Sequence, residues 1–425
     1  LNFTLKSYFY GILFFMLETP FSIFLRPGNP DFLDLPWEKP LSEWRKCCDR
    51  VEELPRGVSR HPVVFINYNG ELFAFKELAL DRAEYEYNVL RSLEEKRLPV
   101  VKAVGYVRIS SPTRQASILI TDYLDHSQPY RSLFIRSEMK RYQEHLLDAV
   151  AGLLVQLHLN GVFWGDCSLS NTLFRRDAGA LQAYLVDAET TQLQENLIPK
   201  QRYDDLMIMK DNITSELADL AASRLLPRNY PLFEIGESIR KRYLRLWEKI
   251  TSEVVLRPTE HYRIQEHVRA LNDLGFSVHE LELSSVDKGS KLRLKAFVGD
   301  RNFHRDQLHA LTGLEAEEKQ AQQIINEIQE IKASLSQKFG REISLPVAAY
   351  HWLEHNYQPF LEYFQPYLET GILSPTEMYC QILEHKWFLS ERAEQDVGFQ
   401  AAMEDYMEKY LPVLFSKEET QENQR

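Results

Sequence analysis

Two aspartates and an asparagine in one stretch of the chain carry the side chains that phosphoryl transfer to a hydroxyl group requires. Asp166 is followed five positions later by Asn171, and Asp187 comes at the end of the apolar segment YLVDAE. One carboxylate can orient and deprotonate an acceptor hydroxyl, while the other carboxylate and the amide oxygen hold magnesium against the phosphates. Hard oxygen ligands suit this hard cation, which keeps several of its waters. The pattern therefore predicts a phosphotransfer site.

A lysine lies upstream of these residues, inside a strand pattern. Lys76 follows the apolar run FAF, and a buried ammonium group needs a strong partner. Glu86 on the next predicted helix and the phosphates of a nucleotide can both supply one. Glu84 is the rival for this role. We favour Glu86 because Leu90 and Leu93 follow it at helical spacing on nearly the same side.

The elements expected around Lys76 form a small sheet with one helix. Strands are predicted at 63–68 and 71–78, joined by Asn69-Gly70, which supplies the positive φ angles of a tight hairpin turn. The further elements are a helix from the N-cap Asp81 to about Lys96 and strands at 103–109 and 117–124.

Helical patterns dominate the chain after Pro129, where apolar residues between 146 and 157 recur at the spacing of a buried helix face. A strand is expected at 183–189, and two strands that begin at Phe276 and Lys291 alternate apolar and polar residues as half-buried strands do. The expected helices cover 202–224, 232–254, 262–275 and 315–335, followed by helical sequence to about residue 415. The fold class predicted from these elements is α+β.

Composition narrows the choice of partners. The chain has 425 residues, and 50 basic against 62 acidic side chains give a formal net charge of −12. We therefore expect no nucleic-acid partner and no general attraction to an anionic membrane. The four cysteines form no CxxC pair, which argues against a zinc site or a disulfide framework and favours a reducing, cytoplasmic location.

An apolar run near the start of the chain, YFYGILFFML behind Lys6, has the outline of a signal-peptide core. It is too short to span a bilayer, Glu18 and Pro20 interrupt it, and no small-residue cleavage site follows. The alternatives are an amphipathic helix packed on the body of the protein and an extension from an early translation start. We expect no stable membrane insertion.

The order of these features repeats the kinase signature set: strand lysine, helix glutamate, buried helix, Asp and Asn in a loop, and Asp after a strand. Residues from about 50 to 225 resemble a protein-kinase-like fold, with WGDCSLSN as the catalytic loop and VDAE as the metal-binding loop. The string GVFWGDCSLSNTLFRRDAGALQAYLVDAET, with LPRGVSRH, HALTGL and EHKWFLSERAEQDVG, closely resembles the bacterial family called domain of unknown function 4032 over nearly the whole chain after about Leu35. This resemblance implies a lipopolysaccharide-kinase-like relative.

The resemblance also implies a role for each site residue. It makes Asp166 the catalytic base, Asn171 and Asp187 the magnesium ligands, Lys76 the ligand of the α- and β-phosphates, and Glu86 its helix partner. The implied cofactors are ATP and Mg2+.

Three departures from the kinase pattern bear on the substrate. No GxGxxG motif precedes the lysine strand; the loop there is RGVSRH, in which backbone N–H groups around Gly57 and the side chains of Ser59, Arg60 and His61 can cover phosphates or form an ordinary basic surface loop. Ala-Glu replaces Phe-Gly after the metal aspartate, so Glu189 is a further metal ligand, a residue that binds the acceptor, or an exposed acid. No Ala-Pro-Glu segment follows, which favours a small-molecule acceptor over a peptide.

These observations predict an α+β, bilobal protein-kinase-like fold with a C-terminal accessory α/β and helical domain. The expected boundaries are an N-terminal apolar extension at 1–33, an N lobe at 34–126, a C lobe at 127–257, the accessory domain at 258–415 and a disordered tail at 416–425. The predicted function is ATP- and magnesium-dependent phosphotransfer to a small-molecule or carbohydrate-like acceptor. The alternatives are a nucleotide-binding pseudokinase or scaffold with a protein partner on residues 258–415, and adenylyl transfer on the same fold. Thiol catalysis by Cys167 is disfavoured because the sequence shows no neighbour that would stabilise a thiolate.

Overall fold

The computed structural model describes residues 21–54, 60–111, 114–135, 140–227, 229–257, 259–260, 262–286 and 291–411. The chain divides into two compact units, and each is described by itself. The first unit comprises residues 1–140, 150–174 and 183–243, and the second comprises 141–149, 175–182 and 244–425.

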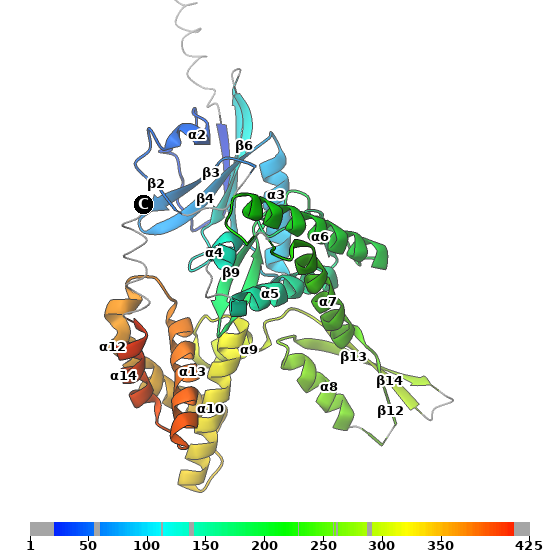
Figure 1. Cartoon of the computed structure of the whole chain (residues 1–425), viewed down its shortest axis with the longest axis vertical. Coiled ribbons are helices and arrows are strands. Elements are labelled where there is room, and N and C mark those ends of the chain that lie inside the picture. The colour runs from blue at the N-terminus through cyan, green and yellow to red at the C-terminus, as the bar shows by residue number, and fades with distance from the viewer. Residues whose placement is uncertain are drawn as a thin grey trace, which may run out of the picture. The chain divides into compact units, whose positions relative to one another are not determined.

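The first unit contains an antiparallel sheet with six strands among the described residues (Figure 1). Their order across the sheet is β1-β5-β6-β4-β3-β2. The strands are β1 (Phe21–Leu25), β2 (Val51–Glu52), β3 (Val63–Tyr68), β4 (Glu71–Leu78), β5 (Ala103–Ser111) and β6 (Arg114–Asp122). The predicted β3–β4 hairpin is confirmed, and both turn residues have positive φ, 55° at Asn69 and 92° at Gly70.

The edge strand β1 departs from the predicted extension. The apolar pattern assigns residues 1–33 to an extension, but β1 pairs with β5 so that Leu25 lies opposite Gly105. A Cβ atom at position 105 would lie 2.3 Å from the carbonyl oxygen of Phe24, so the absence of a side chain allows the two strands to approach. Residues 1–20, which hold the whole apolar run YFYGILFFML, lie outside the described residues.

Aromatic side chains form the core on one side of this sheet. Phe32, Trp37 and Trp44 are buried against Phe75 of strand β4, with Trp44 at the end of the short helix α2 (Leu41–Trp44). The Phe32–Phe75 pair is edge-to-face and the two tryptophan pairs are tilted, and such ring contacts add to the energy of burying apolar area. The packing fixes β4, the strand that carries Lys76.

Helix α3 (Arg82–Glu95) contacts β4, β5 and β6 and begins where the sequence predicts. Asp81 occupies the N-cap position, but it has a φ of 68° and its side chain makes no capping hydrogen bond. Ser117 of strand β6 replaces it, because its hydroxyl accepts the N–H of Ala83 at 3.2 Å. Asp81 instead lies 3.4 Å from Arg108. The start of the helix is thus stabilised from the sheet.

The elements from residue 128 to residue 251 are mainly helical (Figure 1). They are β7 (Gln128–Pro129), α4 (Tyr130–Ile135), α5 (Lys140–Leu159), β8 (Val162–Phe163), β9 (Thr172–Asp177), β10 (Ala180–Leu185), β11 (Gln192–Leu193), α6 (Pro199–Ala222) and α7 (Leu232–Thr251). Strand β10 ends two residues before Asp187, earlier than predicted. After Leu185, the N–H of Val186 donates to the backbone oxygen of Asn171, and the N–H groups of Ala188 and Glu189 donate to side-chain carboxylates.

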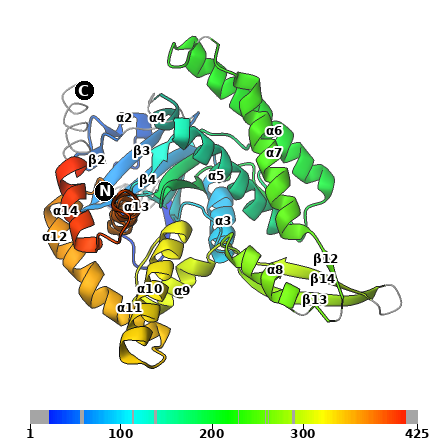
Figure 2. The same ribbon diagram turned by 60° about the horizontal axis from the view of Figure 1, so that its bottom comes forward.

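The second unit combines a small sheet with a helical bundle (Figure 2). Its elements are β12 (Val254–Leu256), α8 (Tyr262–Asn272), β13 (Val278–Val286), β14 (Lys291–Val298), α9 (Phe303–Thr312), α10 (Glu318–Phe339), α11 (Leu345–Trp352), a π-helical turn (Leu353–Tyr357), α12 (Gln358–Leu368), α13 (Pro375–Ala393) and α14 (Phe399–Lys409). The predicted amphipathic helix corresponds to α10, which buries Ala321, Ile324, Ile325 and Ile328.

Strand β13 is more exposed than its alternating pattern predicts. Its partner β14 buries Leu294 completely, but Leu281 and Leu283 of β13 remain 40% and 48% exposed. Strand β13 lies at the edge of the order β12-β14-β13, so it has a neighbouring strand on one side only. The alternation correctly predicts a strand, but not how much of that strand is covered.

A buried polar cluster, which we call the hairpin-tip cluster, holds the turn between β9 and β10 inside the second unit. Asp177 accepts the N–H groups of Lys319 and Gln320 at 2.8 and 2.9 Å, at the start of α10. Glu377 accepts the N–H of Ala178 at 3.0 Å and the side-chain amide of Gln320 at 2.9 Å. The two bonds to Asp177 satisfy N–H groups that the start of α10 leaves without an internal partner, and the bonds to Glu377 tie the turn and Gln320 to helix α13.

Candidate active site

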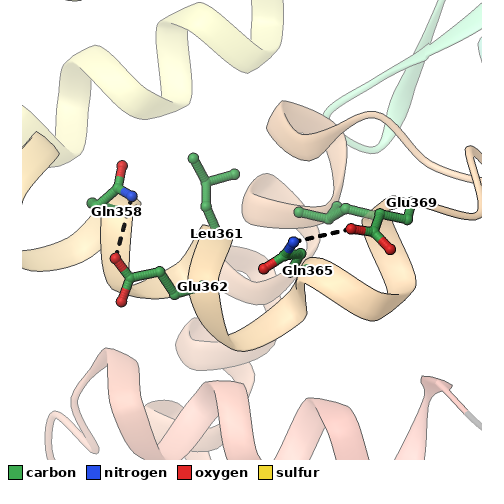
Figure 3. A pocket seen from close by; sticks show the side chains of 6 residues that line it. Gln358, Leu361, Glu362, Gln365 and Glu369 are labelled. Carbon is green, nitrogen blue, oxygen red and sulfur yellow. Dashed lines mark hydrogen bonds between the residues drawn. The ribbon is translucent and has the colours of Figure 1, made fainter.

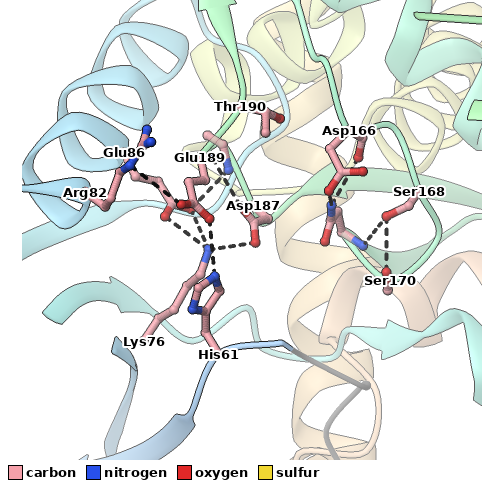
Figure 4. Close-up of polar contacts among 12 residues, drawn as sticks. His61, Lys76, Arg82, Glu86, Asp166, Ser168, Ser170, Asp187, Glu189 and Thr190 are labelled. Atoms are coloured by element: carbon pink, nitrogen blue, oxygen red, sulfur yellow. Dashed lines mark hydrogen bonds and ion pairs between the residues drawn. The ribbon is translucent and has the colours of Figure 1, made fainter. Parts of the chain in front are cut away.

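Lys76, Glu86 and Asp187 meet in the first unit, although they come from a strand, a helix and a loop (Figure 4). The Lys76 Nζ lies 3.1 and 3.2 Å from the two carboxylate oxygens of Glu86 and 2.6 Å from Oδ2 of Asp187. Glu86 also accepts the N–H of Ala188 at 3.0 Å. The Lys76 ammonium group therefore binds two carboxylates. One of them, Asp187, lies 111 positions later in the sequence, just after strand β10.

The protonation state of Lys76 depends on its burial and on the two carboxylates beside it. Glu86 is fully buried and the Lys76 side chain is 12% exposed. Burial disfavours the charged form of Lys76, but the charges of Glu86 and Asp187 outweigh it and raise the pKa of Lys76. Burial also raises the pKa of Glu86, against the opposing effect of Lys76. Lys76 is thus held as a cation.

Glu84, the rival partner, lies on a different side of helix α3. Its carboxylate pairs with the guanidinium of Arg108 and accepts the hydroxyl of Tyr106 at 3.0 Å. Both partners belong to strand β5. The structure therefore brings Glu86, and not Glu84, to Lys76.

Asp166 and Asn171 lie at opposite ends of one tight loop, and their side chains are joined. The amide nitrogen of Asn171 donates to the backbone oxygen and to Oδ2 of Asp166, both at 3.1 Å. The backbone oxygen of Asn171 accepts the N–H of Val186 at 3.1 Å, which places this loop next to the segment that carries Asp187.

The residues at this position have the chemistry of a magnesium site. The amide nitrogen of Asn171 donates to Asp166, so its oxygen is the atom available to a metal, and Asp187 adds a carboxylate that already contacts the Lys76 ammonium group. Magnesium is often held by one or two protein oxygens together with substrate phosphates and waters. Among the described residues, no group of three or more His, Cys, Asp or Glu side chains is placed so that it could hold a metal.

Three side chains on helix α6 hold the loop that contains Asp166, and the sequence reading did not single them out. Asp205 accepts the N–H groups of Trp164 and Gly165, both at 2.8 Å. Glu216 accepts those of Leu169 and Ser170, at 2.9 and 2.8 Å. Asn212 contacts Asp166 itself. Their spacing in the sequence could have revealed them. Positions 205, 212 and 216 share one face of the helix, where these polar residues interrupt the buried stripe of Met209, Ile213 and Leu217.

His158 and Cys167 are structural residues of this region. The ring nitrogens of His158 lie 2.8 Å from the Tyr243 hydroxyl and 3.1 Å from Asp205, as expected of a buried histidine that forms hydrogen bonds. Cys167 is fully buried, and burial raises the pKa of its thiol well above the usual value. A buried, protonated thiol is a poor nucleophile. The geometry therefore agrees with setting thiol catalysis aside.

The loop before strand β3 reaches the same site through His61 (Figure 4). Gly57 and Ser59 lie outside the described residues, and Arg60 is exposed. The His61 Nε2 lies 3.3 Å from the carboxylate of Glu189, which is also 4.0 Å from Arg82 on α3. Glu189 is 27% exposed and interacts with these two basic groups, so it is not a simple solvent-facing acid.

A separate cavity of about 380 Å³ lies along helix α12 in the second unit (Figure 3). It is lined by Gln358, Leu361, Glu362, Gln365, Leu368 and Glu369. None of these belongs to the candidate active site, and two Gln–Glu hydrogen bonds already pair four of the polar groups, at 3.3 and 3.0 Å.

A membrane-spanning helix would need a long apolar stretch, and none of the helices in the described part of the chain has one.

Two family models match separate parts of the chain. Residues 69–228 match the Lipopolysaccharide kinase (Kdo/WaaP) family. We call them the Kdo/WaaP region; it contains Lys76, Glu86, Asp166, Asn171 and Asp187. Residues 245–411 match the family described as Domain of unknown function (DUF4032), and we call them the DUF4032 region. Both resemblances stated from the sequence are confirmed, although the DUF4032 match begins at 245 rather than near residue 35.

The predicted α+β class with a kinase-like region is confirmed as well. Among solved structures, WaaP in complex with acyl carrier protein is similar to 54% of this chain and 98% of its own, with 21% identity and a TM-score of 0.33. Likeness at this level supports no statement about function. None of the curated proteins matches the sequence.

Proposed function

We propose that this chain is an ATP- and magnesium-dependent phosphotransferase that acts on a hydroxyl group of a carbohydrate-like small molecule. The observation that carries the proposal is the contact of Lys76 with both Glu86 and Asp187, beside the loop of Asp166 and Asn171. A strand lysine paired with a helix glutamate, next to two oxygen ligands and a base, is the arrangement that phosphoryl transfer uses. The match of residues 69–228 to a lipopolysaccharide kinase family supports a carbohydrate acceptor.

In this proposal each residue has one role. Asp166 accepts the proton of the acceptor hydroxyl as its oxygen bonds to the γ-phosphorus of ATP and the bond to ADP breaks. Lys76 holds the α- and β-phosphates, and Glu86 keeps Lys76 in place. Asn171 and Asp187 are the residues that would hold magnesium, which neutralises phosphate charge when bound. Backbone N–H groups near Gly57, with Ser59 and Arg60, would cover the phosphates.

The surroundings of the site favour a small acceptor in a reducing compartment. The sequence lacks an Ala-Pro-Glu segment after the metal loop, where protein kinases dock peptides. All four cysteines, Cys47, Cys48, Cys167 and Cys380, are free thiols, which fits a cytoplasmic protein.

The experiment that tests the proposal compares the wild type with Asp166→Asn and Asp187→Ala. Magnesium and ATP should raise the melting temperature of the wild type and of Asp166→Asn, because a ligand at 100 times its Kd stabilises the folded state by about 2.7 kcal/mol. Asp187→Ala should lose the magnesium-dependent part of this shift. Phosphate transfer or release should be lost in both variants.

The matched control is Asp211→Asn, an exposed aspartate on helix α6, which should behave as the wild type. A wild type that binds ATP with magnesium, yet transfers phosphate neither to water nor to any member of a sugar and metabolite library, would contradict phosphotransfer. That outcome would instead support the pseudokinase alternative. Transfer of an adenylyl group would appear as a different mass added to the acceptor.

A further inference from the structure

The carboxylate of Asp166 is held from two separate elements. The side-chain nitrogen of Asn212, on helix α6, donates to Oδ1 of Asp166 at 2.9 Å and to the backbone oxygen of Cys167 at 3.1 Å. The side-chain nitrogen of Asn171 donates to the other oxygen, Oδ2, at 3.1 Å. Each carboxylate oxygen therefore has its own amide donor.

The two partners of Asn212 decide which residue types fit at this position. Both partners are acceptors, so the side chain must present two N–H donors from one atom, which a primary amide does. An aspartate of the same shape would place an oxygen against both acceptors. Alanine would leave the Oδ1 atom of Asp166 without this donor.

Helix α6 holds the loop in two ways. Asp205 and Glu216 bind backbone N–H groups on the two sides of Asp166, which fixes the path of the chain. Neither contact restrains the side chain of Asp166. Asn212 lies between them on the same helix face and is the α6 residue that contacts this carboxylate.

We propose that Asn212 is a positioning residue for the phosphotransfer reaction, acting by fixing the rotamer of Asp166 toward the acceptor hydroxyl. This inference rests on the proposed function of Asp166 as the base. Each carboxylate oxygen has two lone pairs, so Asp166 still accepts a hydrogen bond from the acceptor while Asn171 and Asn212 hold it. If the Asp166 carboxylate is turned away from the acceptor hydroxyl, the rate of the reaction falls, whereas the affinity for the nucleotide stays the same.

The test measures magnesium-dependent ATP hydrolysis, with water as the acceptor, for the wild type, Asn212→Ala and Asn212→Asp. We expect kcat to fall by about tenfold to a hundredfold in both variants. The KM for ATP should stay within about twofold, because the hydrogen bonds of Asn212 go to Asp166 and to the backbone of Cys167 rather than to Lys76 or Asp187. A partly unfolded variant would also lose kcat at constant KM, so each rate is divided by the folded fraction measured by thermal unfolding.

Asp211→Asn is the control, since Asp211 is the exposed neighbour of Asn212. The double variant Asp211→Asn with Asn212→Asp restores the charge of the helix but not the hydrogen bonds, and it should stay as slow as Asn212→Asp. Recovery of its rate would overturn the inference, because the charge alone would then explain the effect. Wild-type kcat in Asn212→Ala, or a fall in kcat matched by a rise in KM, would overturn it as well.

A wild type without turnover would contradict the proposed function and would leave the role of Asn212 to a second measurement. Crystal structures of the wild type and Asn212→Ala then decide between the outcomes. A rotated Asp166 side chain in the variant, with the loop backbone unchanged, supports the positioning role. An Asp166 side chain in its original rotamer overturns it.

Discussion

The carboxylates around Lys76 in the first unit and those of the hairpin-tip cluster in the second are neutralised in different ways. A single lysine side chain holds Glu86 and Asp187, and the Asp187 side chain is 27% exposed. In the hairpin-tip cluster, backbone N–H groups hold Asp177 and Glu377, which are 1% and 4% exposed.

This difference distinguishes a candidate reaction site, the cluster around Lys76, from a purely structural contact, the hairpin-tip cluster. A lysine side chain can exchange one carboxylate for a phosphate without moving the backbone, and an exposed carboxylate is open to a ligand. The N–H groups at the start of α10 cannot exchange partners, because their positions are part of the helix. In the proposed function, the same residue types would serve ligand exchange in the first unit, whereas in the second they hold a fixed geometry.

The largest expected effect is a loss of stability when Lys76 is removed from the cluster that it forms with Glu86 and Asp187. Lys76→Met would leave the buried Glu86 without its cation, and we expect this to cost about 3–5 kcal/mol of unfolding free energy. Urea denaturation measures the loss, with the exposed Lys96→Met as the matched control. The double variant Lys76→Met with Glu86→Gln should regain most of the stability and none of the ATP turnover. A stable single variant would show that Glu86 does not depend on Lys76.

A smaller effect is expected at the hairpin-tip cluster. Asp177→Ala removes the acceptor of two buried N–H groups, so we expect a loss of about 1–3 kcal/mol. The KM for ATP should not change, because the hydrogen bonds of Asp177 go to Lys319 and Gln320, which are not residues of the candidate active site. Hydrogen exchange at Lys319 and Gln320 should become faster. Unchanged exchange at these two amides would contradict the capping role of Asp177.

A third effect depends on pH. Burial first, and then the charge of Glu317, raise the pKa of Asp177 from 3.8 to about 7. The folded state therefore binds a proton that the unfolded state has released, so this group contributes stability at low pH that is lost as pH rises from about 4 to 7. Relative to Asp177→Asn, the wild type should lose up to about 1.4 kcal/mol per pH unit in this window. Parallel stability curves for the two proteins would show that Asp177 stays ionised.

Local sequence patterns were enough to predict several elements in and beside the Kdo/WaaP region. The alternation at 63–68 and 71–78 with the turn Asn69-Gly70 fixed a hairpin, because side chains of a strand alternate between faces and the turn needs positive φ. Helical spacing favoured Glu86 over Glu84, since one turn of a helix decides which side chains share a face. The spacing of Asp166 and Asn171 placed both in one loop.

Tertiary structure decided which of these faces meet. The contact of Lys76 with Asp187 joins residues 111 positions apart, and the hydrogen bond from Asn212 to Asp166 joins residues 46 positions apart. The same holds for the exposure of β13 and for Asp177 at the start of α10. Local spacing sets the backbone and the face on which a side chain lies, whereas burial and charge pairing depend on whatever the rest of the chain places opposite that face.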